Sequence, residues 1–189
     1  MNIKKEIAPK GLEFKPSEFI ISDKYATILT VVSYPKYINT GYLSSLTQMS
    51  GIKVVAKHIP LPFSVIQKML NKEIADLKVK YTEEYDRTTQ ERIRQDYESL
   101  EQFISQLAAN QSKIYDFQLH IMITANSEDE LIAKKLQVKN YVEAMEMRAF
   151  PLRFEQEKVL KSILPIYPKQ VIEDHIGTPI PAPTLAAMY

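Results

Sequence analysis

The sequence predicts an α+β fold: ferredoxin-like βαβ halves on an antiparallel-type sheet, with a long antiparallel helical hairpin inserted between them at residues 64–110. Three observations support this prediction. Two stretches within 64–110 place apolar side chains at steps of three and four residues. Strand-like segments lie immediately on both sides of these stretches. With the hairpin set aside, the order is strand, helix, strand and then strand, helix, strand, which is typical of two βαβ units.

The helical hairpin is predicted from two apolar stripes, each on one helical face. The stripes consist of Ile66, Leu70, Ile74, Leu77 and Tyr81 in the first stretch, and of Ile93, Tyr97, Leu100, Ile104 and Leu107 in the second. Ser64 and Gln67 have capping-box spacing, so we expect the first helix to begin at Ser64. A turn is expected at 86–89. Helices of about 20 residues would be roughly 30 Å long, and their stripes can cover each other.

Three strands are expected before the hairpin, because these segments are rich in β-branched and aromatic residues. They cover residues 19–21, 25–34 and 52–59. Pro35 ends the second strand, since proline cannot donate to a strand ladder. A short helix carrying Leu43, Leu46 and Met49 is expected between the second and third strands. Gly51 follows it, where glycine commonly ends a helix.

A second group of elements is expected after the hairpin. Alternation of side chains predicts a strand at 115–124. Ser127 and Glu130 form a second capping box and open the next helix. A weaker strand at 147–154 contains a proline and therefore belongs at a sheet edge. A short helix is expected at 155–164.

The chain is expected to divide into three parts. Residues 1–16 are polar and contain two prolines and a glycine, so we interpret them as a flexible lead-in. Residues 17–164 form the α/β domain with its insertion at 64–110. Five prolines fall within 165–189, which predicts a stiff, extended, proline-rich connector that does not pack as a core element.

The composition excludes several classes of function. The chain has 189 residues, 24 basic and 23 acidic, with a net charge of +1, so it has no general basic field and we expect no direct nucleic-acid binding. The lack of cysteine excludes disulfides, thiolate zinc sites and cysteine nucleophiles. No apolar run approaches the ~20 residues of a membrane span.

Known catalytic and nucleotide-binding motifs are missing from the sequence. It contains no GxxxxGK[ST], GxGxxG, GxSxG or HExxH pattern. We therefore expect no catalytic residue, no metal site and no cofactor in this chain. His58 and His120 lie on separate predicted strands and could meet across a sheet. Because no carboxylate stands at metal-ligand spacing beside either, we interpret both as structural.

Candidate partner-binding residues lie near the tip of the helical hairpin. They are Tyr81, Tyr85, Arg87, Arg92 and Arg94. Aromatic and arginine side chains are enriched in protein interfaces. Two alternatives stay open: the tyrosines can complete the seam between the helices, and the arginines, which alternate with acidic residues, can belong to a solvated face.

Four stretches, taken in order, carry a family resemblance. SDKYATILTVVSYPKYINTGYLSSL, residues 22–46, has a strand ending in Tyr34 and Pro35, followed by Gly41, Tyr42 and Leu43. KVVAKHIPLPFSVIQKML, FQLHIMITANSEDEL and TPIPAPTLAAMY follow. This order resembles the N-terminal region of the conjugation and type IV secretion ATPases, the VirB-four, TraC and CagE class. The likeness extends from about residue 16 to the end.

The resemblance implies a non-catalytic N-terminal docking and assembly domain of such an ATPase. In that family the activity lies in a C-terminal motor domain with Walker motifs, so ATP and magnesium are expected only for that domain, which this chain lacks. Residues 17–164 would be the docking domain, and 165–189 would lead to the motor. The implied partners are inner-membrane or channel proteins of the conjugation machine and other copies of the ATPase. The implied location is cytoplasmic, peripheral at the bacterial membrane through partners.

A second hypothesis needs no motor domain. The chain would then be a free-standing structural protein that self-associates through its helical hairpin, and the resemblance would be superficial. A catalytic function of its own is the least favoured hypothesis, because nothing in the sequence assembles a nucleophile, a base and oxyanion donors.

Overall fold

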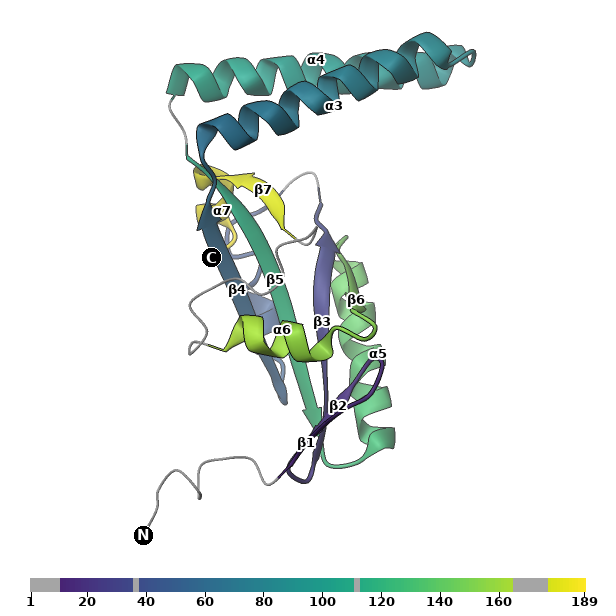
Figure 1. Cartoon of the computed structure of the whole chain (residues 1–189), viewed down its shortest axis with the longest axis vertical. Coiled ribbons are helices and arrows are strands. Elements are labelled where there is room, and N and C mark those ends of the chain that lie inside the picture. Colours follow the sequence, from purple (N-terminus) through teal and green to yellow (C-terminus); the bar gives the residue numbers. More distant parts are fainter. Residues whose placement is uncertain (1–10, 36–37, 111–112, 165–176) are drawn as a thin grey trace. The chain divides into compact units, whose positions relative to one another are not determined.

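A computed structural model describes residues 11–35, 38–110, 113–164 and 177–189, and the side chains of 106–110 lie outside this description. The predicted α+β class is confirmed (Figure 1). The chain divides into two compact units. We call residues 1–58, 116–178 and 183–189 the body, and residues 59–115 and 179–182 the hairpin unit.

In the part of the chain that the structure describes, seven strands form one sheet. They are β1 (Leu12–Phe14), β2 (Phe19–Ile21), β3 (Lys24–Ser33), β4 (Ile52–Pro60), β5 (Ile114–Ala125), β6 (Arg148–Pro151) and β7 (Thr178–Pro181). The main order is β1-β2-β3-β5-β4, while β6 pairs with β3 and β7 pairs with β5. Residues Leu12–Phe14 belong to the stretch 1–16 that the sequence predicts to be a flexible lead-in. That prediction is wrong for these residues, because β1 pairs with β2 in the register Leu12↔Ile21.

β3 is the central strand of the body. One edge pairs with β5 from Tyr25↔Ala125 to Thr30↔His120. The other edge pairs first with β2 and then with β6. The resulting order β6-β3-β5-β4 is compatible with two interleaved βαβ halves. Among the described residues of the first half, the only helix is the four-residue α2 (Ser44–Thr47), so the ferredoxin-like detail stays a prediction.

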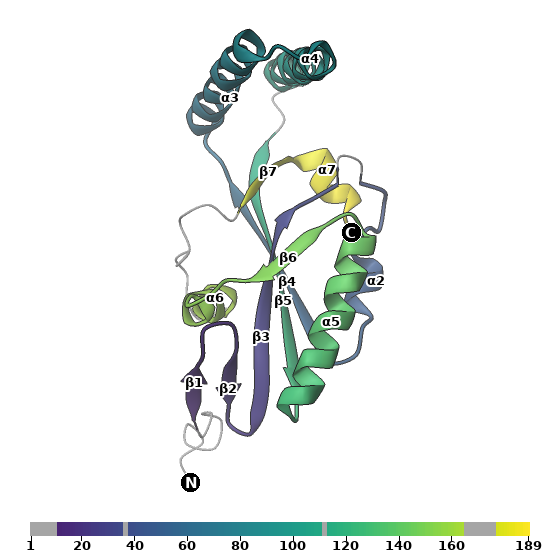
Figure 2. The ribbon, with the colours of Figure 1, turned by 90° about the vertical axis from the view of Figure 1, so that its right-hand side faces the viewer.

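Two helices cover the body sheet on opposite faces (Figure 2). Helix α5 (Glu128–Ala144) begins as predicted: the Glu130 amide donates to Ser127 Oγ at 3.2 Å, and the Glu130 carboxylate accepts from the Asn126 amide at 2.8 Å. Helix α6 (Gln156–Ile163) packs Val159 and Leu160 in one apolar cluster with strand residues of β2 and β3. The central strand is therefore buried on both faces.

The predicted helical hairpin is present between β4 and β5. Helix α3 spans Phe63–Glu83 and helix α4 spans Arg87–Asn110. The predicted capping box at Ser64 is wrong, because Pro62 is the N-cap and no side chain caps the helix. The turn lies at 84–86 rather than 86–89. Asp86 caps α4 by accepting a 2.7 Å hydrogen bond from the Thr89 amide, so Thr89 belongs to the helix.

The C-terminal segment departs from the predicted connector where it is described. Residues 165–176 of that prediction lie outside the described part. Residues 178–181 form β7, and helix α7 covers Ala182–Ala187. Ile180, Leu185 and Met188 are buried. Within the described residues β7 pairs with β5 alone, so it is an edge strand, and an edge strand tolerates its two prolines.

None of the helices in the described ranges combines the length and the apolar character needed to cross a bilayer.

Candidate protein-binding groove

The hairpin unit has a seam that is only partly covered. Ile66 is 5% exposed and Leu77 is 9% exposed, and they are the buried residues of α3. Along α4, none of the described side chains from Arg87 to Ser105 is buried. The rest of the predicted stripes is half-buried, apart from Tyr81, which is exposed, and Leu107, whose side chain is not described. Two helices alone form a single layer, which leaves one side of an apolar seam open to water.

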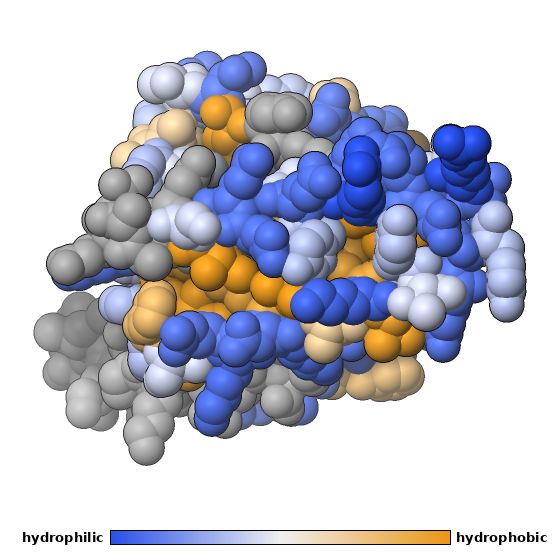
Figure 3. Space-filling view, turned by 90° about the horizontal axis from the view of Figure 1, so that it is seen from above, coloured by the Kyte–Doolittle hydropathy of each residue, from blue (hydrophilic) through white to orange (hydrophobic). Residues whose placement is uncertain are grey.

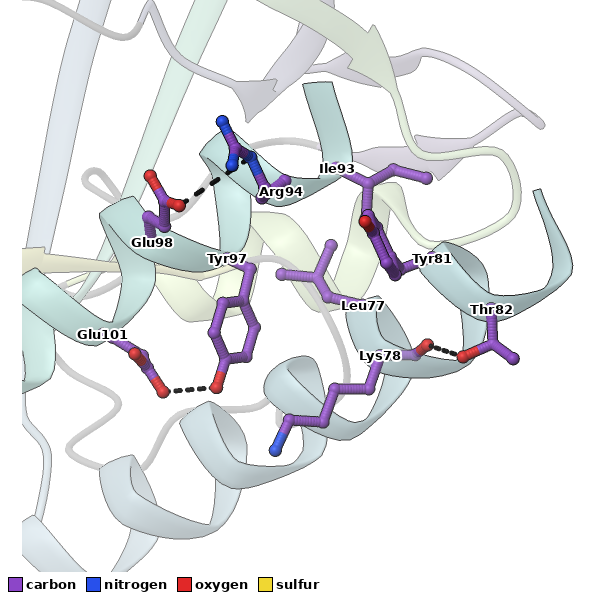
Figure 4. A pocket seen from close by; sticks show the side chains of 9 residues that line it. All are labelled: Leu77, Lys78, Tyr81, Thr82, Ile93, Arg94, Tyr97, Glu98 and Glu101. Atoms are coloured by element: carbon purple, nitrogen blue, oxygen red, sulfur yellow. Dashed lines mark hydrogen bonds and ion pairs between the residues drawn. The ribbon is translucent and has the colours of Figure 1, made fainter. Parts of the chain in front are cut away.

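A groove of about 670 Å³ follows this open side. Its floor and rims are formed by residues of both helices: Leu77, Lys78, Tyr81 and Thr82 from α3, and Ile93, Arg94, Tyr97, Glu98 and Glu101 from α4 (Figure 4). We call this feature the hairpin groove. Figure 3 shows a hydrophobic strip bordered by hydrophilic side chains along this seam. An apolar floor with charged rims is typical of a protein-binding surface.

The α4 rim of the hairpin groove carries an ordered set of charges. Arg94 lies 2.7 Å from the Glu91 carboxylate and 3.9 Å from that of Glu98. The hydrogen bond that the Arg94 guanidinium donates to the Glu91 carboxylate raises the pKa of Arg94. The Tyr97 hydroxyl donates to the Glu101 carboxylate, and this bond raises the pKa of Tyr97. With Arg94 neutralised by its neighbours, the rim is acidic.

The α3 rim is basic near the same place. The Lys78 ammonium lies 5.5 Å from the centroid of the Tyr97 ring, close enough for a cation–π interaction. Figure 4 shows Lys78 and Glu101 on different helices with Tyr97 between them. The Tyr97 ring therefore separates a positive rim from a negative rim across the hairpin groove.

The structure brings together two of the five predicted partner-binding residues. Tyr81 and Arg94 line the hairpin groove. Tyr85 lies in the turn between the helices and is 98% exposed. Arg87 is the first residue of α4, and Arg92 is exposed on α4; neither lines the groove. The predicted group is therefore divided between the groove, the turn and the outer surface.

Sequence reasoning missed Lys78, Glu98 and Glu101 as site residues. The signal was present: each lies one position after a stripe residue, where a helix places the border of its apolar face. What the sequence did not show is which border faces an open groove.

The body contains a separate buried polar group on the central strands. His120 is fully buried, and its Nδ1 lies 3.0 Å from the Thr30 hydroxyl. Burial and, to a smaller degree, the Lys57 charge lower the pKa of His120 to about 4. His120 Nε2 and the side-chain oxygen of Gln118 are buried and have no hydrogen-bond partner among the described residues. The imidazole is therefore neutral at neutral pH.

His58 has different surroundings from His120. Its ring stacks on Phe117 at 5.4 Å between centroids, and its Nε2 lies 2.9 Å from the Tyr189 hydroxyl. Within the described part of the chain, no group of three acidic or histidine side chains has the arrangement needed to hold a metal ion.

Comparison with protein-family models and with curated proteins found no match to this chain.

Proposed function

We propose that this chain is a non-catalytic docking and assembly domain of a conjugation or type IV secretion ATPase, and that the helical hairpin is its protein-contact element. The observation that carries the proposal is the open hairpin groove. Only Ile66 and Leu77 are buried among the described hairpin side chains, so the seam has apolar surface available for a partner.

The chemistry of the hairpin groove fits a protein better than a nucleic acid. Its lining combines Leu77 and Ile93 with Tyr81 and Tyr97, the apolar and aromatic side chains from which interface anchors are drawn. The rims carry both signs of charge, whereas a nucleic-acid site needs a cationic field. A polypeptide with apolar anchors and charges of both signs can match every part of this lining.

The assignment to secretion rests on the order of the four resembling sequence stretches, since a fold alone does not define a function. Under this proposal the hairpin binds inner-membrane or channel proteins at the cytoplasmic face of the membrane. ATP and magnesium would be bound by a motor domain outside this chain. Sequencing the DNA downstream of the Tyr189 codon gives a direct test. An open reading frame that continues into a GxxxxGK[ST] loop agrees with the proposal, and an immediate stop codon contradicts it.

A cross-linking experiment tests the role of the hairpin. Replacing Tyr85 by the photoreactive amino acid benzoylphenylalanine places a probe at the exposed turn with little change in shape. The matched control carries the same probe at Phe154, which is 78% exposed on the body. Cells expressing each variant together with the neighbouring genes are irradiated, and the adducts are identified by mass spectrometry.

The proposal expects the Tyr85 probe to form adducts with a membrane or channel protein encoded beside this chain. The Phe154 probe should not give the same adduct. Adducts that form equally from both positions, or that contain only unrelated abundant proteins, would contradict a docking role for the hairpin.

A further inference from the structure

We propose that the hairpin groove binds the same groove of a second copy of this chain, forming a four-helix bundle with a twofold axis that runs along the groove. This inference rests on the proposed function in one respect, that the hairpin is a protein-contact element. It adds the identity of one partner and the residues that set the geometry.

The seam between α3 and α4 is incomplete on its open side. Ile93 and Tyr97 lie half-buried in the hairpin groove beside the buried Leu77, and within the described residues no other helix of the hairpin unit covers their apolar surface (Figure 4). Helical hairpins bury such a seam fully when two of them stack into a four-helix bundle. A second copy supplies an apolar strip of the same length and shape, because it is the same strip.

Two charged groups on the rims of the hairpin groove have no ion-pair partner among the described residues. Within the described residues, no carboxylate lies within ion-pair distance of the Lys78 ammonium. The Glu101 carboxylate accepts the Tyr97 hydroxyl and has no cationic partner among those residues. Both groups line the hairpin groove, one on each rim. A basic rim and an acidic rim therefore face the open side.

Twofold symmetry brings the two rims of opposite charge together. Rotation by half a turn about an axis along the hairpin groove places the α3 rim of one copy over the α4 rim of the other. This rotation keeps each residue at the same position along the direction of the helices. Lys78 of α3 lies beside Tyr97 of α4, and Tyr97 precedes Glu101 by four residues. Each Lys78 therefore meets the acidic rim of the other copy, and the contact occurs twice. An axis across the helices would instead place α3 against α3 and lose this complementarity.

Exchange of charges tests the pairing. Sedimentation equilibrium of the full chain is expected to show a dimer that dissociates on dilution. Lys78→Glu and Glu101→Lys each place like charges in both symmetry-related contacts, so each variant alone should raise the dimer Kd by roughly tenfold. An equimolar mixture of the two variants restores both attractive contacts and should return the Kd to near the parent value.

Matched controls use the same helices and the same charge changes. Lys80→Glu on α3 and Asp96→Lys on α4 alter exposed residues that do not line the hairpin groove. They should leave the Kd within about twofold of the parent. Circular dichroism checks that every variant is folded, which is expected because all four side chains are exposed. The inference would be overturned by any one of three results. The parent chain stays monomeric, the mixed variants do not regain the parent Kd, or the control variants raise the Kd as much as the rim variants do.

Cysteine pairs test the geometry independently of charge. The chain has no cysteine, so new thiols have no internal competitor. A mixture of Lys78→Cys and Glu101→Cys chains, oxidised with copper phenanthroline, should form a disulfide-linked dimer. A mixture of Lys80→Cys and Glu101→Cys should not. Equal yields from both mixtures would exclude this orientation.

The inference and the proposed function can fail separately. A monomeric chain whose Tyr85 probe still captures a neighbouring channel protein would reject the second-copy partner and keep the docking role. A dimer with the expected charge exchange, whose Tyr85 probe captures no protein encoded nearby, would keep the bundle and reject the secretion assignment.

Discussion

Single residues of the body have effects that can be measured, and Gln156 is the clearest example. The outer edge of β3 pairs with β2 up to Ala26 and with β6 from Leu29 onward, which leaves Ile28 without a strand partner on that side. Gln156 fills this position: its oxygen accepts from the Ile28 amide at 2.9 Å, and its nitrogen donates to the Ile28 carbonyl at 3.2 Å. One side chain thus replaces a missing strand residue.

Gln156→Ala should therefore lower the free energy of unfolding by about 3 kcal/mol, because it leaves a buried amide and a buried carbonyl unsatisfied. Urea denaturation followed by circular dichroism gives the value. Gln137→Ala, on the exposed face of α5, is the control and should change the stability by less than about 0.5 kcal/mol. Equal effects of the two substitutions would contradict the bridging role.

His120 predicts a dependence of stability on pH. Its pKa is about 4 in the folded chain, against about 6.5 when unfolded. The unfolded chain therefore binds more protons between these values, so stability is fully present above pH 6.5 and falls as the pH decreases toward 4. The loss from this residue alone approaches about 3 kcal/mol.

His120→Gln removes the titrating group and keeps a side chain able to bond Thr30. Unfolding free energies measured between pH 7 and pH 4 should show a shallower pH dependence for this variant than for the parent. Parallel slopes for the two proteins would show that His120 is not the group responsible.

At the scale of elements, the hairpin depends on a short turn fixed by two carboxylates. Glu84 accepts from the amides of Tyr85 and Asp86, and Asp86 accepts from the amide of Thr89. The bonds from Thr89 lower the pKa of the Asp86 carboxyl. This geometry places the start of α4 at Arg87 and sets where the hairpin groove begins.

Asp86→Ala should loosen the first turn of α4, because the first amides of a helix lose their acceptor. Hydrogen exchange followed by NMR should show several-fold faster exchange at Thr89 and unchanged protection at Leu100. Asp96→Ala, in the interior of α4, is the control and should leave the Thr89 rate as in the parent. An unchanged Thr89 rate in Asp86→Ala would contradict the capping role.

The elements also show what the sequence could and could not predict. The three- and four-residue spacing of the apolar stripes correctly predicted helices α3 and α4, because this spacing reflects which face of each helix packs against the other helix. The cap at Ser127 is confirmed, although the Glu130 carboxylate accepts from the Asn126 amide rather than from that of Ser127. The capping box at Ser64 is wrong, because spacing alone does not say which residue leaves the helical conformation. The groove rim at Lys78 and Glu101 was not predicted, since it depends on which border of the seam stays open.

At the scale of the whole molecule, the C-terminal residues contribute to the body core although they are rich in proline. Met188 is fully buried, and the Leu43 amide donates to its carbonyl at 3.0 Å. The sequence predicted a connector here because proline disfavours regular structure. It did not reveal that β5, which lies between β3 and β4, also pairs with β7, because this is a property of tertiary pairing.

Met188→Ala should lower the free energy of unfolding by about 3 kcal/mol, from lost apolar burial and the cavity that remains. Met69→Ala is the matched control, because Met69 is 46% exposed on α3. Thermal and urea unfolding of both variants measure the difference. A Met188→Ala protein as stable as the parent would mean that residues 183–189 do not belong to the core.

The hydrogen bond between the Leu61 amide and the Ile114 carbonyl, at 3.0 Å, closes the hairpin at its base. The two backbone positions at which the insertion leaves and re-enters the sheet are therefore neighbours. In genetic terms the hairpin is a cassette: we expect that residues 62–113 can be excised and replaced by a two-residue Asn-Gly turn that joins β4 to β5. Under the proposed function, loss, gain or exchange of such a cassette would change what the protein recognises and leave the strand order intact.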